Sequence, residues 1–291
     1  MGTEPRFYRV EKEGPVIIWK FHNPPRNLAT LETWGELVQL VEEFDRDPAV
    51  RVGIITSATP GMFIQHFDVS LIVEWAEGLS RASDEEVAQQ LAVLPPPKGI
   101  AEYTSKPVIC AINGPVEGGG CEMALGCDVR FISRDVFMGQ PEVNAGIIPG
   151  GGGTQRLVRL LGAAKAMELC LTGRRVYPDE AERLGLVTKA CDPDELMPTV
   201  MAFAQELATK PPLAVINIKK AIYEGNNMTL PDGLLLERDL FFETLRSDEA
   251  LEIMRLYVAT GQDREKLAAL VEKVGRDPEK IAALLAEEQK E

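Results

Sequence analysis

Residues Lys106 to Leu160 read KPVICAINGPVEGGGCEMALGCDVRFISRDVFMGQPEVNAGIIPGGGGTQRLVRL and contain the motifs that decide the fold. The stretch opens with an apolar, β-prone run, 107–112, which ends at an Asn113–Gly114 turn. Three glycines, 118–120, precede a helical pattern that carries Glu122 one turn in. Glycine between a strand and a helix lets backbone N–H groups approach a ligand, and the helix N-terminus adds a partial positive charge. The pattern therefore predicts a ligand site of backbone N–H groups beside a carboxylate.

A second carboxylate follows the next predicted strand. The β-prone run 129–132 leads into the sequence Gly-Gln-Pro-Glu at 139–142. Glu122 and Glu142 are twenty positions apart, and each lies next to glycine-rich backbone. Further along, 150–153 is a run of four glycines that resembles an anion cradle. No Lys-Ser/Thr pair follows it, so it is not a P-loop.

These motifs together closely resemble the crotonase superfamily, the enoyl-CoA hydratases and isomerases. In that family NGxxxGGGCE forms half of an oxyanion hole and carries one catalytic glutamate, and GQPE carries the other. The resemblance covers roughly residues 7–250. It implies a crotonase-like spiral of ββα repeats with a helical C-terminal region. The alternation of predicted strands and helices alone indicates only an α/β fold with parallel strands.

Hydration of an α,β-unsaturated thioester needs a base for water, an acid for Cα, and donors for the enolate oxygen. The resemblance implies that Glu122 and Glu142 are the catalytic pair and that the Gly119 N–H is one oxyanion donor. Two carboxylates can divide the acid and base roles when their surroundings separate their pKa values. A simpler interpretation makes Glu122 a first-turn acid that complements the helix dipole. The joint presence of GGGCE and GQPE favours catalysis.

The second oxyanion donor is expected in the loop after the predicted strand 50–56. Family members commonly read F-[SA]-A-G-A-D there, whereas this chain reads FIQHFD at 63–68. The alignment makes Phe67 the donor and puts His66 where glycine is usual, although backbone freedom is expected to matter there. His66 is either a proton-transfer group or a packing residue, and packing is the commoner role of a single histidine.

Glu117 is a second departure from the family, which usually has an apolar or small residue before the glycines. This carboxylate could raise the pKa of a neighbour, bind a polar acyl group, or point to solvent. The resemblance also implies that the loop 22–29 contacts coenzyme A, with Arg26 near the nucleotide phosphates. The expected substrate-binding residues are Arg26, Leu28, Gln65, His66, Asp68, Glu117 and Gly118.

We expect two parts in the chain: a spiral α/β core with the CoA and active sites at 1–200, and a helical trimerisation region at 201–291. Residues 71–104 form a helical section, interrupted by three prolines at 95–97, that is either a surface connection or a border of the acyl pocket. The segment 263–291 shows two charged amphipathic helices separated by Asp277–Pro278. This segment extends beyond the usual end of family members, and we expect it to dock on a neighbouring subunit, cover the CoA site, or remain a solvated appendage.

Composition narrows the class of protein. The net charge of −14 argues against non-specific nucleic-acid binding. Five cysteines without a CxxC pair, and an N-terminus without a charged-then-apolar leader, predict a reduced cytoplasmic location. No apolar run approaches the length of a membrane span, and no cluster has metal-ligand spacing. We therefore expect no membrane or nucleic-acid partner, no metal, and no cofactor beyond the coenzyme A of the substrate.

The sequence thus predicts an enzyme, an enoyl-CoA hydratase that adds water syn to a trans-2-enoyl-CoA. The nearest alternative is another acyl-CoA reaction on the same scaffold, such as double-bond isomerisation or C–C or thioester hydrolysis. A remote alternative is a non-catalytic scaffold or an RNA-binding protein of the same fold. That alternative predicts lost glutamates or a basic surface, and neither is present. The resemblance further implies a homotrimer or a dimer of trimers.

Overall fold

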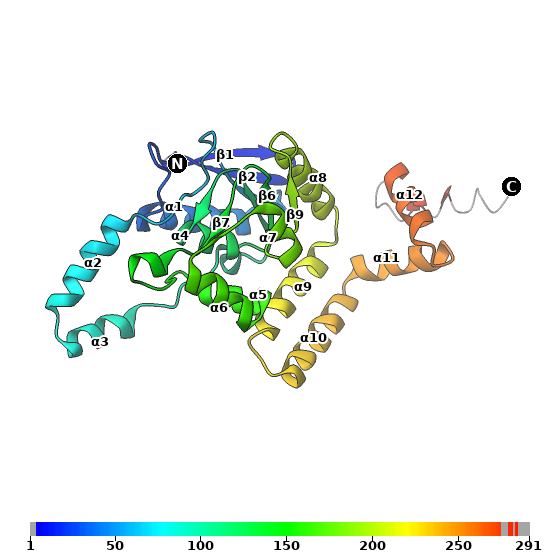
Figure 1. Ribbon diagram of the computed structural model, residues 1–291. Coiled ribbons are helices and arrows are strands. Elements are labelled where there is room, and N and C mark those ends of the chain that lie inside the picture. Colours follow the sequence, from blue (N-terminus) through cyan, green and yellow to red (C-terminus); the bar gives the residue numbers. More distant parts are fainter. Residues whose placement is uncertain (1–3, 275–278, 282, 285–291) are drawn as a thin grey trace. The chain divides into compact units, whose positions relative to one another are not determined.

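The computed structural model of the protein describes residues 4–274, 279–281 and 283–284 (Figure 1). Contacts between Cα atoms divide the chain into two compact units, Met1–Thr209 and Lys210–Glu291. The first unit holds both sheets and all the residues that the sequence singles out as a site. The second unit is helical. Each unit is described by itself.

The main sheet of the first unit has six strands in the order β1-β2-β3-β4-β6-β9. Only β1 and β2 are antiparallel, and every other neighbouring pair is parallel. A turn at Gly14, where φ is 56°, joins β1 to β2 in a hairpin. The strands are β1 (Tyr8–Glu13), β2 (Val16–Phe21), β3 (Val52–Ser57), β4 (Val108–Ile112), β6 (Val129–Ser133) and β9 (Lys189–Cys191).

Both faces of this sheet are covered. Alternate residues of one strand enter different clusters: Trp19 packs on one face with helix α1 (Leu31–Arg46), and Ile18 packs on the other with α8 (Leu196–Ala208). All six residues of β3 are buried, as predicted for a strand covered on both sides. Thr30 caps α1 in a capping box with Thr33, which fixes the start of the helix.

A second, three-stranded sheet lies beside the glycine-rich turn. Its order is β5-β7-β8, formed by β5 (Val116–Glu117), β7 (Met138–Gly139) and β8 (Arg175–Val176). Register aligns Glu117 with Gly139 and Gly139 with Arg175. The alternating set Val116, Met138 and Val176 is buried in the core. The sheet therefore presents Glu117 and Arg175 on its other face, with a glycine between them.

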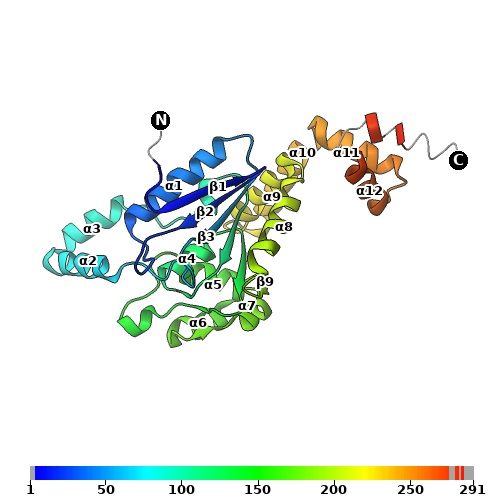
Figure 2. The same ribbon diagram turned by 90° about the horizontal axis from the view of Figure 1, so that it is seen from above.

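Short helices connect the two sheets and surround the predicted site. They are η1 (Ile100–Tyr103), α4 (Gly119–Leu125), η2 (Glu142–Ala145), α5 (Gly153–Leu161), α6 (Ala163–Thr172) and α7 (Pro178–Leu184). By contrast, α2 (Val69–Arg81) and α3 (Asp84–Val93) bury none of their side chains. Both views draw these two helices projecting from the sheets (Figures 1 and 2).

The second unit consists of α9 (Pro212–Gly225), α10 (Leu230–Leu245), α11 (Asp248–Ala259) and α12 (Arg264–Val274). A small cluster of Leu256, Leu270 and Ile281 is buried within this unit. The predicted break at Asp277–Pro278 and most of the second tail helix lie outside the described residues. Across the described residues, no helix combines the length and apolar character needed to cross a bilayer.

Candidate active site

Two backbone N–H groups from different loops lie side by side at the glycine-rich turn. The Ala29 N–H donates to the His66 carbonyl (2.9 Å), so the trans peptide aims the Phe67 N–H away from Ala29. A Cβ added to Gly119 would lie only 3.2 Å from the Phe67 nitrogen. In the part of the chain that the structure describes, neither the Phe67 N–H nor the Gly119 N–H donates a hydrogen bond. Both donors are therefore available to a ligand oxygen.

His66 occupies its position without the backbone freedom of glycine. Among described non-glycine residues, only Asn27 and Gln262 have positive φ, so His66 is unstrained. Its Nδ1 lies 2.7 Å from the Phe67 carbonyl oxygen and its Nε2 lies 3.4 Å from a guanidinium nitrogen of Arg26. With Nδ1 protonated, the ring donates to Phe67 and faces exposed Arg26 through its acceptor nitrogen. His66 thus links the Phe67 loop to the Arg26 loop.

The Glu122 carboxylate is held by the run of four glycines. Glu122 is buried in α4, and its Oε1 accepts hydrogen bonds from the N–H groups of Gly151 (2.7 Å) and Gly153 (2.8 Å). A Cβ on Gly151 would lie 2.6 Å from Glu122 Oε2, so the approach requires glycine. Burial raises the pKa of Glu122, while these two N–H groups and Arg156 oppose that rise by favouring the carboxylate. The run at 150–153 is therefore an anion cradle whose anion is a side chain of the same chain.

Glu142 has different surroundings. It begins η2 and is half-buried, and desolvation raises its pKa to about 7, with Glu122 and Glu117 adding repulsion. The buried Gln140 amide, oriented to satisfy its hydrogen bonds, donates to both carboxylate oxygens at 2.8 and 3.0 Å. A Cβ on Gly153 would lie 2.7 Å from the Gln140 amide and 3.0 Å from Glu122 Oε1. Gln140 thus lies between the two glutamates, and Glu142 is poised to exchange a proton near neutral pH.

Glu117 has a cationic partner on the neighbouring small strand. Its Oε1 lies 3.4 Å from Arg175 Nε, across Gly139, and the Arg175 guanidinium lies 4.0 Å from the Phe137 ring centroid. The Glu117 side chain is only a quarter exposed, so this carboxylate does not simply point to solvent, which was one of its three predicted roles. Its charge contributes to the raised pKa of Glu142.

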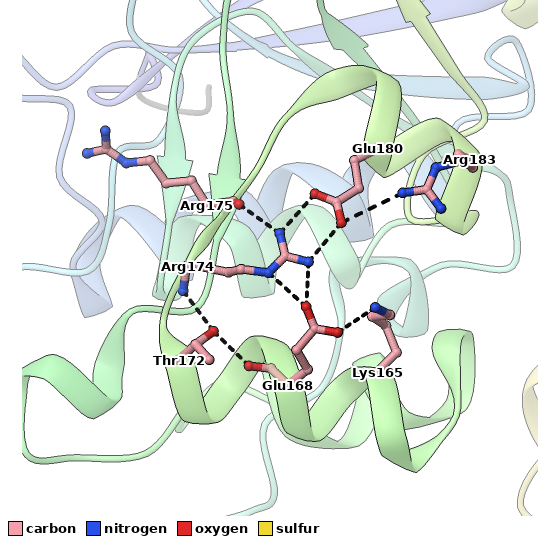
Figure 3. Close-up of polar contacts among 7 residues, drawn as sticks. All are labelled: Lys165, Glu168, Thr172, Arg174, Arg175, Glu180 and Arg183. Carbon is pink, nitrogen blue, oxygen red and sulfur yellow. Dashed lines mark hydrogen bonds and ion pairs between the residues drawn. The ribbon is translucent and has the colours of Figure 1, made fainter.

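The strand that carries Arg175 is fixed by a cluster of charged side chains (Figure 3). Arg174 donates to Glu168 on α6 and to Glu180 on α7, with distances of 2.7–2.9 Å. Lys165 and Arg183 complete the cluster. These bonds join α6, β8 and α7 at the point where Arg175 begins its strand.

The remaining predicted residues support the loops. Asp68 caps α2 by accepting from the Ser70 N–H (3.0 Å). Gln65 bonds through its backbone, with its N–H to the Asn27 carbonyl (3.1 Å) and its carbonyl to the Glu117 N–H (2.9 Å). Half-buried Leu28 accepts from the Asn23 amide through its carbonyl (2.9 Å). Gly118, with φ of 53°, precedes α4, and a Cβ there would lie 3.1 Å from Glu142 Oε1.

Sequence reasoning missed the partners of the two glutamates. The sequence motifs did not show which groups would contact the two carboxylates. These groups are the backbone N–H donors of Gly151 and Gly153, the Gln140 amide, and Arg156. The anion-cradle resemblance of the glycine run was the available signal. Arg175 carried no signal, because its pairing with Glu117 depends on the register of three two-residue strands. Among the described residues, no three His, Cys, Asp or Glu side chains are grouped to hold a metal ion.

Comparisons with known proteins agree with this geometry. The family model described as enoyl-CoA hydratase/isomerase matches residues 11–265. Short-chain-enoyl-CoA hydratase of Clostridium acetobutylicum is 34% identical over 86% of this chain and 93% of that protein. Crotonyl-CoA hydratase of Syntrophomonas wolfei is 34% identical over 91% and 94%. A crystal structure of an enoyl-CoA hydratase subunit I from Geobacillus kaustophilus superposes with a TM-score of 0.77 at 32% identity, over 89% of this chain and 97% of that one.

Proposed function

The chain belongs to the enoyl-CoA hydratase/isomerase family, and we propose that it is an enoyl-CoA hydratase that adds water syn to a trans-2-enoyl-CoA. The observation that carries the proposal is the contrast between two neighbouring carboxylates. At Glu122, hydrogen bonds from two backbone N–H groups favour the ionised form and oppose the rise in pKa that burial causes. At Glu142, burial and the neighbouring carboxylates raise the pKa to about 7. A base and an acid of these properties are what hydration needs.

In the proposed reaction Glu122 takes a proton from water as the water oxygen bonds to Cβ. The electron pair of the double bond moves toward the thioester, and the Phe67 and Gly119 N–H groups stabilise the enolate oxygen. Glu142 then delivers its proton to Cα. The product is a 3-hydroxyacyl thioester, and proton exchange with solvent restores the starting protonation of both glutamates.

Coenzyme A enters as part of the substrate, and no separate cofactor takes part in these steps. We propose that the expected substrate-binding residues line its path, with Arg26 near the nucleotide phosphates, because Arg26 is exposed and contacts His66 beside the Phe67 donor. Relatives named for short-chain and crotonyl substrates make crotonyl-CoA the first substrate to test. Isomerisation shuttles a proton between carbons and needs no base for water, so the presence of Glu122 in addition to Glu142 favours hydration over that alternative.

The experiment is a spectrophotometric assay of crotonyl-CoA, following loss of the conjugated-thioester absorbance. Wild type is compared with Glu122→Gln, Glu142→Gln and the control Glu42→Gln, whose carboxylate is exposed on α1. We expect rapid loss in wild type and control, and a fall of about a hundredfold or more in each active-site variant. Absence of turnover by folded wild-type protein would contradict the proposal.

We also propose that the protein forms a trimer or a dimer of trimers through its helical second unit. Contiguous exposed apolar side chains are typical of protein interfaces. The exposed apolar side chains of α9, α10 and α11 include Ile218, Ile222, Leu234, Phe241, Phe242 and Val258. Light scattering should give three or six times the 32.0 kDa protomer mass, and a monomer mass would contradict this. A cytoplasmic location is part of the proposal, and the five free cysteines suit a reducing compartment.

A further inference from the structure

Arg156 folds back from α5 over the glycine run that holds Glu122. Its Nη1 donates to the Gly151 carbonyl at 2.8 Å, and its side chain is only 18% exposed. The return is possible because Gly152 has φ of 104° and no side chain, since a Cβ there would lie 2.0 Å from Arg156 Nη1. Gly152, which lies between the two donors to Glu122, therefore leaves the space that the Arg156 guanidinium occupies.

The other end of the guanidinium is anchored outside the loop. Arg156 Nη2 lies 3.0 Å from Glu102 Oε1 on η1 and 3.4 Å from the Pro97 carbonyl. Glu102 is itself held, because the same oxygen accepts from the Gly99 N–H at 2.6 Å. Arg156 therefore ties the glycine run to the segment that follows the three prolines.

We propose that Arg156 is a positioning residue for Glu122, which clamps the run 150–153 against Glu102 so that the Gly151 and Gly153 N–H groups stay aimed at the carboxylate. Gly151 bonds in both directions: its carbonyl accepts from Arg156 and its N–H donates to Glu122 Oε1 (2.7 Å). The effect of Arg156 on the reaction rate rests on the proposed hydratase function, in which ionised Glu122 activates water. The contacts that form the clamp do not depend on that function.

The clamp also has an electrostatic effect. Arg156 lowers the pKa of Glu122, opposing the rise caused by burial. Among the described residues, the other side chains that interact electrostatically with Glu122 are Glu142, Cys121 and Cys170, and none of these three is a cation. Loss of Arg156 should therefore raise the pH at which Glu122 ionises, both by removing the charge and by loosening the two N–H donors.

The test uses Arg156→Met in the full-length chain, with Arg159→Met as matched control. Arg159 lies on the same helix and is exposed. Within the described part of the chain, its side chain bonds only Gln155, through the carbonyl (3.0 Å) and the side-chain oxygen (3.2 Å). Isotope-labelled glycine amides are followed by NMR as pH is varied. Signals that titrate in wild type and lose this titration in Glu122→Gln report the ionisation of Glu122.

In Arg156→Met we expect the midpoint of these signals to rise by about one pH unit, and the acid limb of kcat/KM to move with it, about tenfold in rate per unit. Glu102→Gln, which keeps an acceptor but loses the charge, should shift this midpoint in the same direction by less. If Arg156→Met does not fold, the shift in Glu102→Gln tests the clamp in its place. An unchanged midpoint, or an equal shift in Arg159→Met, overturns the clamp. If wild type does not hydrate crotonyl-CoA, the hydratase proposal fails while the amide titration still judges the clamp.

Discussion

Glu142 should carry a stability cost that its removal relieves. In the folded chain its pKa is raised from 4.5 to about 7, so the folded state binds the proton more tightly than the unfolded state does. Below about pH 4 the group is protonated in both states and costs nothing. The cost grows as pH rises from the unfolded pKa to the folded pKa, and it is complete above about pH 7. Glu142→Gln should therefore stabilise the protein at alkaline pH, although the same substitution is expected to lower the hydration rate.

The size of the effect follows from the two pKa values. One pKa unit corresponds to about 1.4 kcal/mol, so the rise from 4.5 to about 7 sets an upper limit of about 3 kcal/mol. Solvent reaches part of the half-buried carboxylate and screens its interactions, which reduces the expected gain to about 1–2 kcal/mol.

Urea unfolding of wild type, Glu142→Gln and the exposed control Glu42→Gln would measure this difference in stability. All three are compared at one protein concentration, because any self-association makes the measured stability depend on concentration. The free energy of unfolding of Glu142→Gln should exceed that of wild type near pH 8 and approach it near pH 4. A difference that does not change with pH, or a loss of stability near pH 8, would show that folding does not raise the pKa of Glu142.

Three further predictions concern residues beside the two glutamates and the backbone N–H donors. Gly119→Ala should lower kcat about tenfold or more, because its Cβ would lie 2.8 Å from the Phe67 Cβ and force the two N–H donors apart. Glu117→Gln should lower the pKa of Glu142 and move the alkaline limb of the rate to lower pH. Arg175→Met should move that limb to higher pH, because it leaves the Glu117 charge unpaired. Steady-state kinetics across pH measure all three variants.

Their controls are equally specific. Gly35→Ala on α1 meets no atom within 4 Å, so it should leave kcat unchanged. If Gly119→Ala kept wild-type kcat, the closeness of the two donors would be irrelevant to the rate. Alkaline limbs that moved in the same direction in Glu117→Gln and Arg175→Met would contradict a charge effect.

Much of the first unit could be predicted from the sequence because its signals are local. Strand β3 consists mostly of apolar and β-branched residues, and the Thr30 cap precedes helical spacing in α1. The two-residue strands β5, β7 and β8 have no such pattern, because their pairing depends on contacts between distant segments. The sheet that aligns Glu117 with Arg175 was therefore beyond sequence reasoning.

The candidate site divides in the same way. Sequence motifs identify Glu122, Glu142 and the glycines of α4. In these motifs the chemistry explains why each residue type is present. Their partners come from elsewhere in the fold: Gly151 and Gly153 reach Glu122 from across the site, and Arg156 reaches back over Gly152. A glycine run indicates that backbone will approach something closely, but only the structure identifies what it approaches.

Hydration by Glu122 and Glu142 can be tested by following the oxygen atom of water during turnover. Crotonyl-CoA is incubated with the protein in water that carries heavy oxygen, and the products are analysed by mass spectrometry. Hydration predicts an intact 3-hydroxybutyryl-CoA with one labelled oxygen at C3, formed by wild type and lost in both Glu122→Gln and Glu142→Gln. Label in a free carboxylate with release of coenzyme A, or a shifted double bond without label, would contradict a hydratase built on these two glutamates.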